Sequence, residues 1–271
     1  MSGLTRIECG TTHRKLWFAV LACLSACAVL GLSCCKATLP YRAKAEVVRS
    51  YKHDASALTQ CLVFDGGALY ESTGLYGESS LRRVDLETGE VLRIHHLPDE
   101  LFGEGCAVWG DTVVQLTWKA GIGFVYDKET LSIERQFTYP GEGWGLTEDG
   151  ERLIMSDGTS YLRFLNPETL AETGRVQILD DGQPVDQLNE LEWIGGEVWA
   201  NVWQTPEIVR VDPESGHVLG WIDLSQLVES EPRGVLNGIA NKGRRIYVTG
   251  KRWTSIYQVE IEPADASSGP Q

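Results

Sequence analysis

Short apolar stretches recur along the chain, and each contains or follows one polar or aromatic residue that breaks the apolar pattern. The stretches are LTQCLVF (58–64), FGEGCAVW (102–109), GWGLTEDG (143–150), LNELEWI (188–194) and LNGIANK (236–242). The pattern-breaking residues are, in chain order, Gln60, Glu104, Trp144, Asn189 and Asn237. They are separated by 44, 40, 45 and 48 positions. A period of this size, with several short strands in each repeat, is typical of β-propeller blades.

A second motif recurs beside the first and predicts turns between paired strands. It occurs as VDLETGEVL (84–92), YDKETLSIE (126–134), LNPETLAET (165–173) and VDPESGHVL (211–219). An Asp or Asn starts such turns because its side chain accepts hydrogen bonds from the backbone just ahead of it. Helical periodicity is nearly absent, whereas β-branched residues, aromatic residues and turn signals are dense. The chain is therefore predicted to be all-β.

The two motifs together predict a five-bladed β-propeller. The first motif occurs five times and the turn motif only four times, so the fifth blade lacks an outer strand. The segment AEVVRSYKHD (45–54) precedes the first blade and is predicted to supply that strand. This closure by an N-terminal strand would remove exposed sheet edges. We expect the propeller to cover residues 45–262 and a flexible tail to follow at 263–271.

The N-terminal part of the chain has the pattern of an export signal. Arg14 and Lys15 precede an apolar run at 16–32, as in a charged region followed by a hydrophobic region. The run leads into LSCC, which resembles a degenerate bacterial lipoprotein box with Cys35 as the lipidated residue. A single transmembrane anchor is the alternative, although a run this short barely spans a bilayer. The predicted segments are a signal peptide, lipoprotein signal or membrane anchor at 1–35 and a linker at 36–44. Both alternatives predict an exported domain, in the periplasm or cell envelope.

The charge of the chain excludes one class of partner. The formal net charge is −14, and residues 1–35 contribute +2, which leaves −16 on the remainder. Such an acidic domain repels phosphate groups, so nucleic acid is not expected as a partner. The same charge favours solubility, and we expect a monomer.

Propeller symmetry predicts that the pattern-breaking residues meet. The first strand of each blade lines the central axis, so these five residues would converge near one mouth of the channel, with residues of the second strands nearby. The simplest alternative is that axial polar groups solvate a wet channel. Against it, the glycines beside Glu104 favour close approach of a ligand or of backbone. A carboxylate among indoles should also have a raised pKa, because burial disfavours its charge, and this suits proton transfer near neutral pH.

The motifs carry a family resemblance. The segments TQCL, LYESTGLYG, FGEG, QLTW, GFVYD, GWGL, LNELEW, ANVWQT and TGKRW follow one another between about residues 50 and 260. In this order they resemble the glutaminyl-peptide cyclotransferases of the plant and bacterial type, also called glutamine cyclotransferases. The resemblance implies a five-bladed propeller that converts the N-terminal glutamine of peptides or proteins to pyroglutamate and releases ammonia. No cofactor is expected for catalysis, and a structural calcium ion is compatible with the channel.

The resemblance also implies roles for individual residues. Glu104 is the implied proton shuttle, which takes a proton from the α-amine and returns it to the leaving nitrogen. The residues implied to bind substrate are Gln60, Trp118, Trp144, Asn189, Trp203 and Lys251. Among them, Gln60 and Asn189 would hold the amide and the backbone carbonyl, and Lys251 would stabilise the developing oxyanion. Glu71 is a competing acid that we interpret as structural, bonding backbone at a turn.

Two features depart from the family pattern. Cys61 and Cys106 are the two cysteines outside the leader, and strand alternation lets them either face each other across adjacent blades or point directly away. We therefore weigh a disulfide in an oxidising compartment against two small buried apolar side chains. The second departure is the irregular loop at 230–233, a candidate for part of the substrate mouth.

Two other function classes stay open. A calcium-dependent lactonase-like propeller hydrolase would use axial ligands such as Glu104, Asn189 and Asn237. A non-catalytic, protein-binding propeller would not require Glu104. The histidines of the domain are scattered along the chain, so a catalytic transition-metal site is not expected.

Overall fold

The computed structural model describes residues 41–231 and 233–264. The predicted leader, all but the last residues of the linker and nearly all of the tail lie outside the described residues. β1 begins at Arg42 and β22 ends at Pro263, so the strands reach slightly beyond both predicted ends of the propeller. Within the described ranges, α1 (Ser225–Ser230) is the one α-helix, and no helix there is long and apolar enough to cross a bilayer.

The described chain is all-β, as predicted, and its sheets are antiparallel with one exception. Three sheets have four strands each: β2 (Thr59–Asp65), β3 (Ala68–Thr73), β4 (Ser80–Val84) and β5 (Val91–His96); β6 (Gly103–Trp109), β7 (Thr112–Thr117), β8 (Ile122–Asp127) and β9 (Ile133–Thr138); β10 (Leu146–Glu148), β11 (Leu153–Ser156), β12 (Tyr161–Leu165) and β13 (Glu172–Gln177). A small hairpin joins β14 (Leu179–Asp180) to β15 (Gln183–Pro184).

The remaining strands form one eight-stranded sheet that joins the two ends of the domain. Its order is β16 (Leu188–Ile194), β17 (Glu197–Val202), β18 (Glu207–Val211), β19 (Val218–Asp223), β1 (Arg42–Lys52), β22 (Ser255–Pro263), β21 (Arg245–Gly250) and β20 (Leu236–Lys242). β1 pairs in parallel with β19 and antiparallel with β22. The N-terminal strand therefore completes the last set of strands, as predicted, and also ties that set to the one before it.

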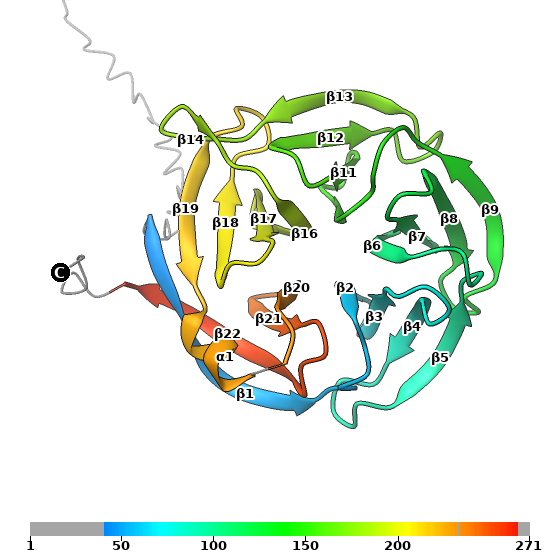
Figure 1. The fold of residues 1–271 in the computed structure, drawn as a ribbon, viewed down its shortest axis with the longest axis horizontal. Coiled ribbons are helices and arrows are strands. Elements are labelled where there is room, and N and C mark those ends of the chain that lie inside the picture. The colour runs from blue at the N-terminus through cyan, green and yellow to red at the C-terminus, as the bar shows by residue number, and fades with distance from the viewer. Residues whose placement is uncertain (1–40, 232, 265–271) are drawn as a thin grey trace, which may run out of the picture. The chain divides into compact units, whose positions relative to one another are not determined.

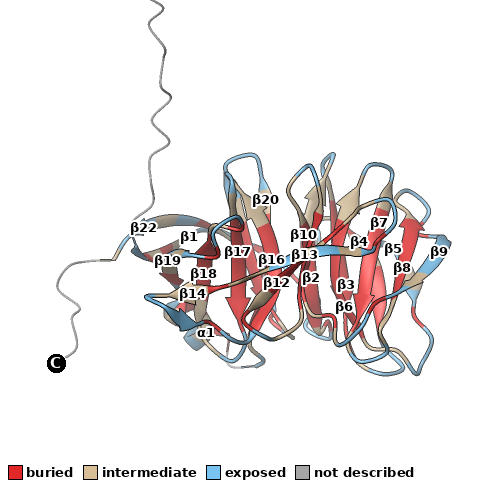
Figure 2. Cartoon of the chain, turned by 90° about the horizontal axis from the view of Figure 1, so that it is seen from above, coloured by how far each residue is buried: buried red, intermediate tan, exposed pale blue. Residues whose placement is uncertain are grey.

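The sheets surround a central axis in a propeller-like arrangement (Figure 1). The inner strands touch in the cyclic order β2, β6, β10, β16, β20 and back to β2. Apolar layers fill the space between successive sheets. One layer packs Ala107 and Val114 against Leu146 and Met155, and another closes the circle between the last and first sets of strands. Buried residues accordingly follow the inner strands, while exposed residues gather in loops and outer strands such as β9 (Figure 2). These layers remove apolar surface from water and hold the axis rigid.

The repeated turn motif has the predicted structure. It connects the third and fourth strands of four sets, and in each copy the Asp or Asn side chain accepts hydrogen bonds from the turn. In the first copy, Asp85 accepts from the backbone N–H and the hydroxyl of Thr88 at 2.8 and 2.9 Å. The later copies repeat this with Asp127 and Thr130, Asn166 and Thr169, and Asp212 with Glu214 and Ser215.

Four of the five inner strands carry an irregularity at the pattern-breaking residue, whereas Trp144 precedes the regular strand β10. Pairing with the second strand shifts register between Thr59 and Cys61, Gly103 and Cys106, Leu188 and Leu191, and Leu236 and Ile239. Each interval contains one pattern-breaking residue. A bulge re-aims a side chain that regular alternation would send elsewhere. The sequence pattern located these positions, but the bulges themselves were not foreseen.

A disulfide joins Cys61 to Cys106, which confirms one of the two alternatives drawn from the sequence. The Cα atoms are 5.7 Å apart, within the ordinary range for a disulfide. Both cysteines are buried, and they lie in the apolar layer between the first two sheets. The bridge connects β2 to β6, the strands that carry Gln60 and Glu104.

Candidate active site

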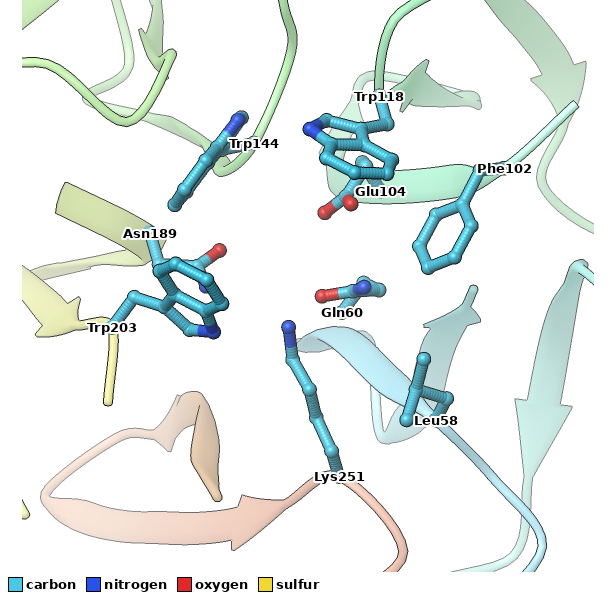
Figure 3. A pocket seen from close by; sticks show the side chains of 9 residues that line it. All are labelled: Leu58, Gln60, Phe102, Glu104, Trp118, Trp144, Asn189, Trp203 and Lys251. Atoms are coloured by element: carbon cyan, nitrogen blue, oxygen red, sulfur yellow. The ribbon is translucent and has the colours of Figure 1, made fainter. Parts of the chain in front are cut away.

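One cavity gathers every residue that was expected to act on a substrate. It has a volume of about 270 Å³ and is lined by Leu58, Gln60, Phe102, Glu104, Trp118, Trp144, Asn189, Trp203 and Lys251. Figure 3 shows the Glu104 carboxylate, the Gln60 amide and the Lys251 amine pointing toward a common space between the indoles. The cavity is mainly apolar, with a few convergent polar groups, as small-molecule sites commonly are.

Two equivalent positions of the repeat supply most of the lining. Gln60, Glu104 and Asn189 are each the second residue of an inner strand, namely β2, β6 and β16. Trp118, Trp203 and Lys251 each follow directly after a second strand, namely β7, β17 and β21. In the first sheet the corresponding residue is Gly74. A Cβ there would lie 2.2 Å from the Phe102 ring, so this glycine leaves space for Phe102.

The glycines around Glu104 permit a close approach of backbone. A Cβ on Gly105 would lie 2.5 Å from the amide nitrogen of Leu146, and one on Gly103 would lie 2.7 Å from the carbonyl oxygen of Thr73. The N–H of Gly105 donates to the carbonyl of Trp144 at 2.7 Å. Neighbouring strands, rather than a ligand, therefore occupy the space that the glycines leave, and this packing fixes Trp144 beside Glu104.

Glu104 lies in an environment that disfavours its charge. The side chain is buried, and burial raises its pKa well above the usual value. The positive charge of Lys251 opposes this rise, and the negative charge of Glu142 adds to it. Burial likewise lowers the pKa of Lys251, against the attraction of Glu104. The raised pKa predicted for this carboxylate is confirmed, and it suits a group that both accepts and returns a proton.

The indoles pack against one another around the cavity. Trp144 and Trp203 meet edge to face, with ring centroids 5.6 Å apart. Phe102 makes the same kind of contact with Trp118 at 5.5 Å. The N–H groups of Trp118 and Trp144 both donate to one carboxylate oxygen of Glu142, at 2.7 and 2.9 Å. Sequence reasoning missed Glu142, because its contacts join two indoles that are far apart in the sequence.

Asn189 presents an unused acceptor. Its side chain is buried and lines the cavity, and its Oδ1 has no hydrogen-bond partner. A buried acceptor without a partner costs free energy, so the site favours a ligand that brings an N–H or O–H group to this oxygen.

Asn237 does not take the place that symmetry suggested. It is fully buried behind Gln60, and its Nδ2 donates to the carbonyl of Thr59 at 3.0 Å and to Oε1 of Gln60 at 3.3 Å. Asn237 therefore helps to hold Gln60, which lines the cavity, in position. Asn237 is therefore not a direct member of the cavity wall.

Glu231 and Val235, on either side of the undescribed residue 232, contact the turn that carries Lys251. Lys251 donates its backbone N–H to the carbonyl of Val235 at 2.9 Å. The carboxylate of Glu231 accepts from Thr254 and from the Tyr257 hydroxyl. Glu231 and Val235 thus contact the turn that carries Lys251, and a place for residues 230–233 at the substrate mouth stays a prediction.

Glu71 is structural, but its partners differ from the expected backbone groups. It accepts from the Thr59 hydroxyl at 2.8 Å and pairs with Nε2 of His53 at 2.8 Å. The other ring nitrogen of His53 lies 2.8 Å from the carbonyl oxygen of Trp253. Both ring nitrogens face acceptors, which favours the doubly protonated imidazolium. This buried pair links the strand of Gln60 to the turn of Lys251.

We expect His53→Gln to destabilise the domain by about 3–5 kcal/mol, the usual result of removing one partner from a buried ion pair. Burial alone would lower the pKa of His53, but Glu71 outweighs it and raises this pKa above 6.5, while His53 helps to lower the pKa of Glu71 below 4.5. The His53 contribution is therefore complete below about pH 6.5 and is lost as pH rises through the higher folded pKa. The Glu71 contribution is lost as pH falls below about 4.5.

Urea unfolding of wild type and His53→Gln between pH 5 and pH 9 measures this effect. The difference in unfolding free energy should be largest near pH 5–6 and should shrink toward pH 9. A difference that stays constant over this range would show that His53 is not charged in the folded state.

Among residues 41–231 and 233–264, no three His, Cys, Asp or Glu side chains are grouped where they could share a metal ion.

Three comparisons with known proteins agree on one protein family. Residues 19–261 match the protein family described as glutamine cyclotransferase. A glutaminyl-peptide cyclotransferase of Arabidopsis thaliana is 45% identical over 234 residues, which cover 83% of this chain and 73% of the plant protein. The crystal structure of Myxococcus xanthus glutaminyl cyclase superposes with a TM-score of 0.79 at 38% identity, covering 83% of this chain and all of that one.

Proposed function

The chain belongs to the glutamine cyclotransferase family, and we infer that it is a glutaminyl-peptide cyclotransferase, which converts the N-terminal glutamine of peptides to pyroglutamate and releases ammonia. The observation that assigns the reaction to particular residues is the composition of the cavity. Between its indole walls, the buried carboxylate of Glu104 faces the amine of Lys251 and the amides of Gln60 and Asn189. A glutaminyl residue needs this combination: an apolar enclosure and a few polar groups to orient both of its ends.

Glu104 is the proposed proton shuttle. The α-amine attacks the γ-carboxamide carbon, a C–N bond forms, and the original amide C–N bond breaks with loss of ammonia. One proton must leave the attacking amine and reach the departing nitrogen. A single carboxylate between the two nitrogens can carry it, and burial, which raises the pKa of Glu104, makes the protonated form of this carboxylate easier to reach.

The remaining polar groups have proposed binding roles. Lys251 stabilises the negative charge that develops on the carboxamide oxygen. The unpartnered Oδ1 of Asn189 accepts an N–H from the substrate, which would satisfy its buried lone pairs. Gln60, held by Asn237, contacts the amide or the adjacent backbone carbonyl.

The aromatic walls are proposed to fold the substrate. Trp118, Trp144 and Trp203 enclose the side chain so that its carboxamide lies against its own amine. Holding reacting atoms at near-attack distance accounts for much of the acceleration of a ring closure. The enclosure also excludes water, which strengthens the electrostatic contacts inside.

We propose five blades for the propeller. The support is the presence of five four-strand groups, three as separate sheets and two joined in the eight-stranded sheet. We also propose that catalysis needs no cofactor, since cyclisation requires only proton transfer and charge stabilisation. A structural calcium ion is compatible with this chemistry.

We propose that the domain is exported to the periplasm or cell envelope and acts there as a monomer. The support is the charged and apolar pattern that ends at Cys35. Mass spectrometry of the mature N-terminus would distinguish a lipidated Cys35 from a retained anchor.

Ammonia release from a Gln-initiated dipeptide by the purified full-length chain tests the function. We expect release from this dipeptide and none from its N-acetylated form, because the acetyl group removes the nucleophilic amine. Activity should persist in a chelator. A folded chain without activity on the dipeptide would contradict the proposal, and calcium-dependent hydrolysis of a lactone by such a chain would favour a calcium-dependent propeller hydrolase.

A further inference from the structure

Glu142 is a carboxylate beside the cavity for which neither the sequence repeats nor the proposed reaction supplies a role. It belongs to the segment PGEGWG between β9 and β10, and its side chain is 39% exposed. Its Oε2 accepts from the indole N–H of Trp118 at 2.7 Å and of Trp144 at 2.9 Å. These indoles come from neighbouring sheets, so a single oxygen atom joins two walls of the cavity.

The segment around Glu142 is itself held at several points. The N–H of Gly143 donates to the carbonyl of Trp118 at 2.9 Å. The buried guanidinium of Arg163 donates to the carbonyl of Pro140 at 2.9 Å. The Tyr139 hydroxyl accepts the N–H of Thr117 at 2.9 Å. The carboxylate is therefore presented by a fixed backbone, which makes it suited to orient other groups.

The chemistry of the contact favours a strong hold on both rings. An ionised carboxylate has several acceptor sites, and hydrogen bonds to it are stronger than those between neutral groups. An indole has a single N–H donor, so Trp118 and Trp144 each use their only side-chain hydrogen bond to contact Glu142. Without the acceptor, both rings would keep their packing but lose the contact that fixes their orientation.

Lys119 is a cation close to Glu142 and neutralises its charge only in part. Its Nζ lies 3.9 Å from Oε1 of Glu142 and 3.9 Å from the centroid of the Trp118 ring. More than half of the Lys119 side chain is exposed, so solvent screens this cation. Glu142 therefore keeps a negative potential at the cavity, in keeping with its effect on Glu104.

We propose that Glu142 is a positioning residue that fixes the Trp118 and Trp144 indoles as one wall of the pocket and supplies negative charge beside Glu104. This inference rests on the proposed cyclisation for its kinetic consequence, but the contact with the indoles can be tested without substrate.

Two variants separate the two parts of the role. Glu142→Leu removes both the acceptor and the charge. Glu142→Gln keeps an oxygen that can accept from the indoles and removes only the charge. Asp180→Asn is the matched control, because Asp180 accepts from the indole N–H of Trp221 at 2.9 Å and neither residue lines the cavity.

We expect Glu142→Leu to lower kcat/KM for the Gln-initiated dipeptide about 10- to 100-fold, since a displacement of about 1 Å at a site can cost that much. Glu142→Gln should lose less. In a plot of kcat/KM against pH, the rise on the acidic side should also move to lower pH in Glu142→Gln, because loss of the neighbouring negative charge lowers the pKa of Glu104. Asp180→Asn should change neither quantity. The proposal would be overturned if Glu142→Gln and Glu142→Leu lowered kcat/KM equally and the acidic side of the pH profile did not move.

Hydrogen exchange of the indole N–H groups, followed by NMR, gives an activity-independent test. In Glu142→Leu the signals of Trp118 and Trp144 should exchange faster, while the signal of Trp221 should not change. Unchanged exchange at Trp118 and Trp144 would overturn the inference even if the wild type is active. A wild type that releases no ammonia would instead contradict the proposed function.

Discussion

Replacing Glu104 by glutamine should lower ammonia release about 10²- to 10⁴-fold while leaving the fold intact, because the variant keeps the size and hydrogen-bonding reach of the side chain but cannot carry a proton. Glu104 is buried at the cavity and has a raised pKa, so the folded protein tolerates a neutral side chain there. The measurement is kcat for the Gln-initiated dipeptide, beside a melting curve that verifies folding.

Glu192→Gln provides the matched control for this change. Glu192 is also a buried carboxyl, and burial raises its pKa to about 8, but it lies on β16 at a separate cavity. Its replacement should leave kcat near the wild-type value. If Glu104→Gln kept wild-type activity, another group would have to move the proton, and the mechanism proposed for Glu104 would be wrong.

Removing the disulfide should lower the stability of the domain by an amount similar to the loss expected for His53→Gln. The two cysteines are 45 residues apart in sequence, and a cross-link over that distance restricts the unfolded chain by about 4 kcal/mol in the chain-entropy account, within the usual range of about 2–5 kcal/mol. We expect the double variant Cys61→Ala/Cys106→Ala to lose that much unfolding free energy in urea.

A reductant distinguishes the cross-link from the packing of the sulfur atoms. Reduction should lower the unfolding free energy of the wild type nearly to that of the double variant and should leave the unfolding free energy of the double variant unchanged. Equal urea midpoints for oxidised and reduced wild type would show that the bridge contributes little to stability.

The fold was largely predictable because its repeats are visible as spacing. Asp85 and its equivalents mark turns through a local contact between one side chain and the next few backbone groups, and local contacts can be read from sequence. The closing role of the segment at 45–54 followed from the missing outer strand. Its second pairing, in parallel with β19, depends on how two neighbouring sets of strands meet, and no local signal encodes it.

The site was predictable where it obeys the symmetry of the fold. Gln60, Glu104 and Asn189 occupy equivalent places, so the repeat and the family resemblance identify them together. Asn237 has the same place in its strand, but its Nδ2 donates to Thr59 and Gln60 of the neighbouring strand, and this contact between strands is not visible in the repeat. Glu142 was missed for a related reason. Its role depends on two indoles that approach each other only in the folded protein.

The position of β1 at the seam of the eight-stranded sheet has a consequence for protein synthesis. Among the strands that the structure describes, β1 is made first, yet its partners β19 and β22 are among the last. The backbone N–H and C=O groups of β1 can therefore pair with β19 and β22 only after the strands that lie between them in the sequence have been made. Pairing between distant segments is slow because a long loop has to close first. The sheet edges that β1 closes therefore stay open until the synthesis of β22 is complete, so we expect closure of the propeller to be a late step in folding.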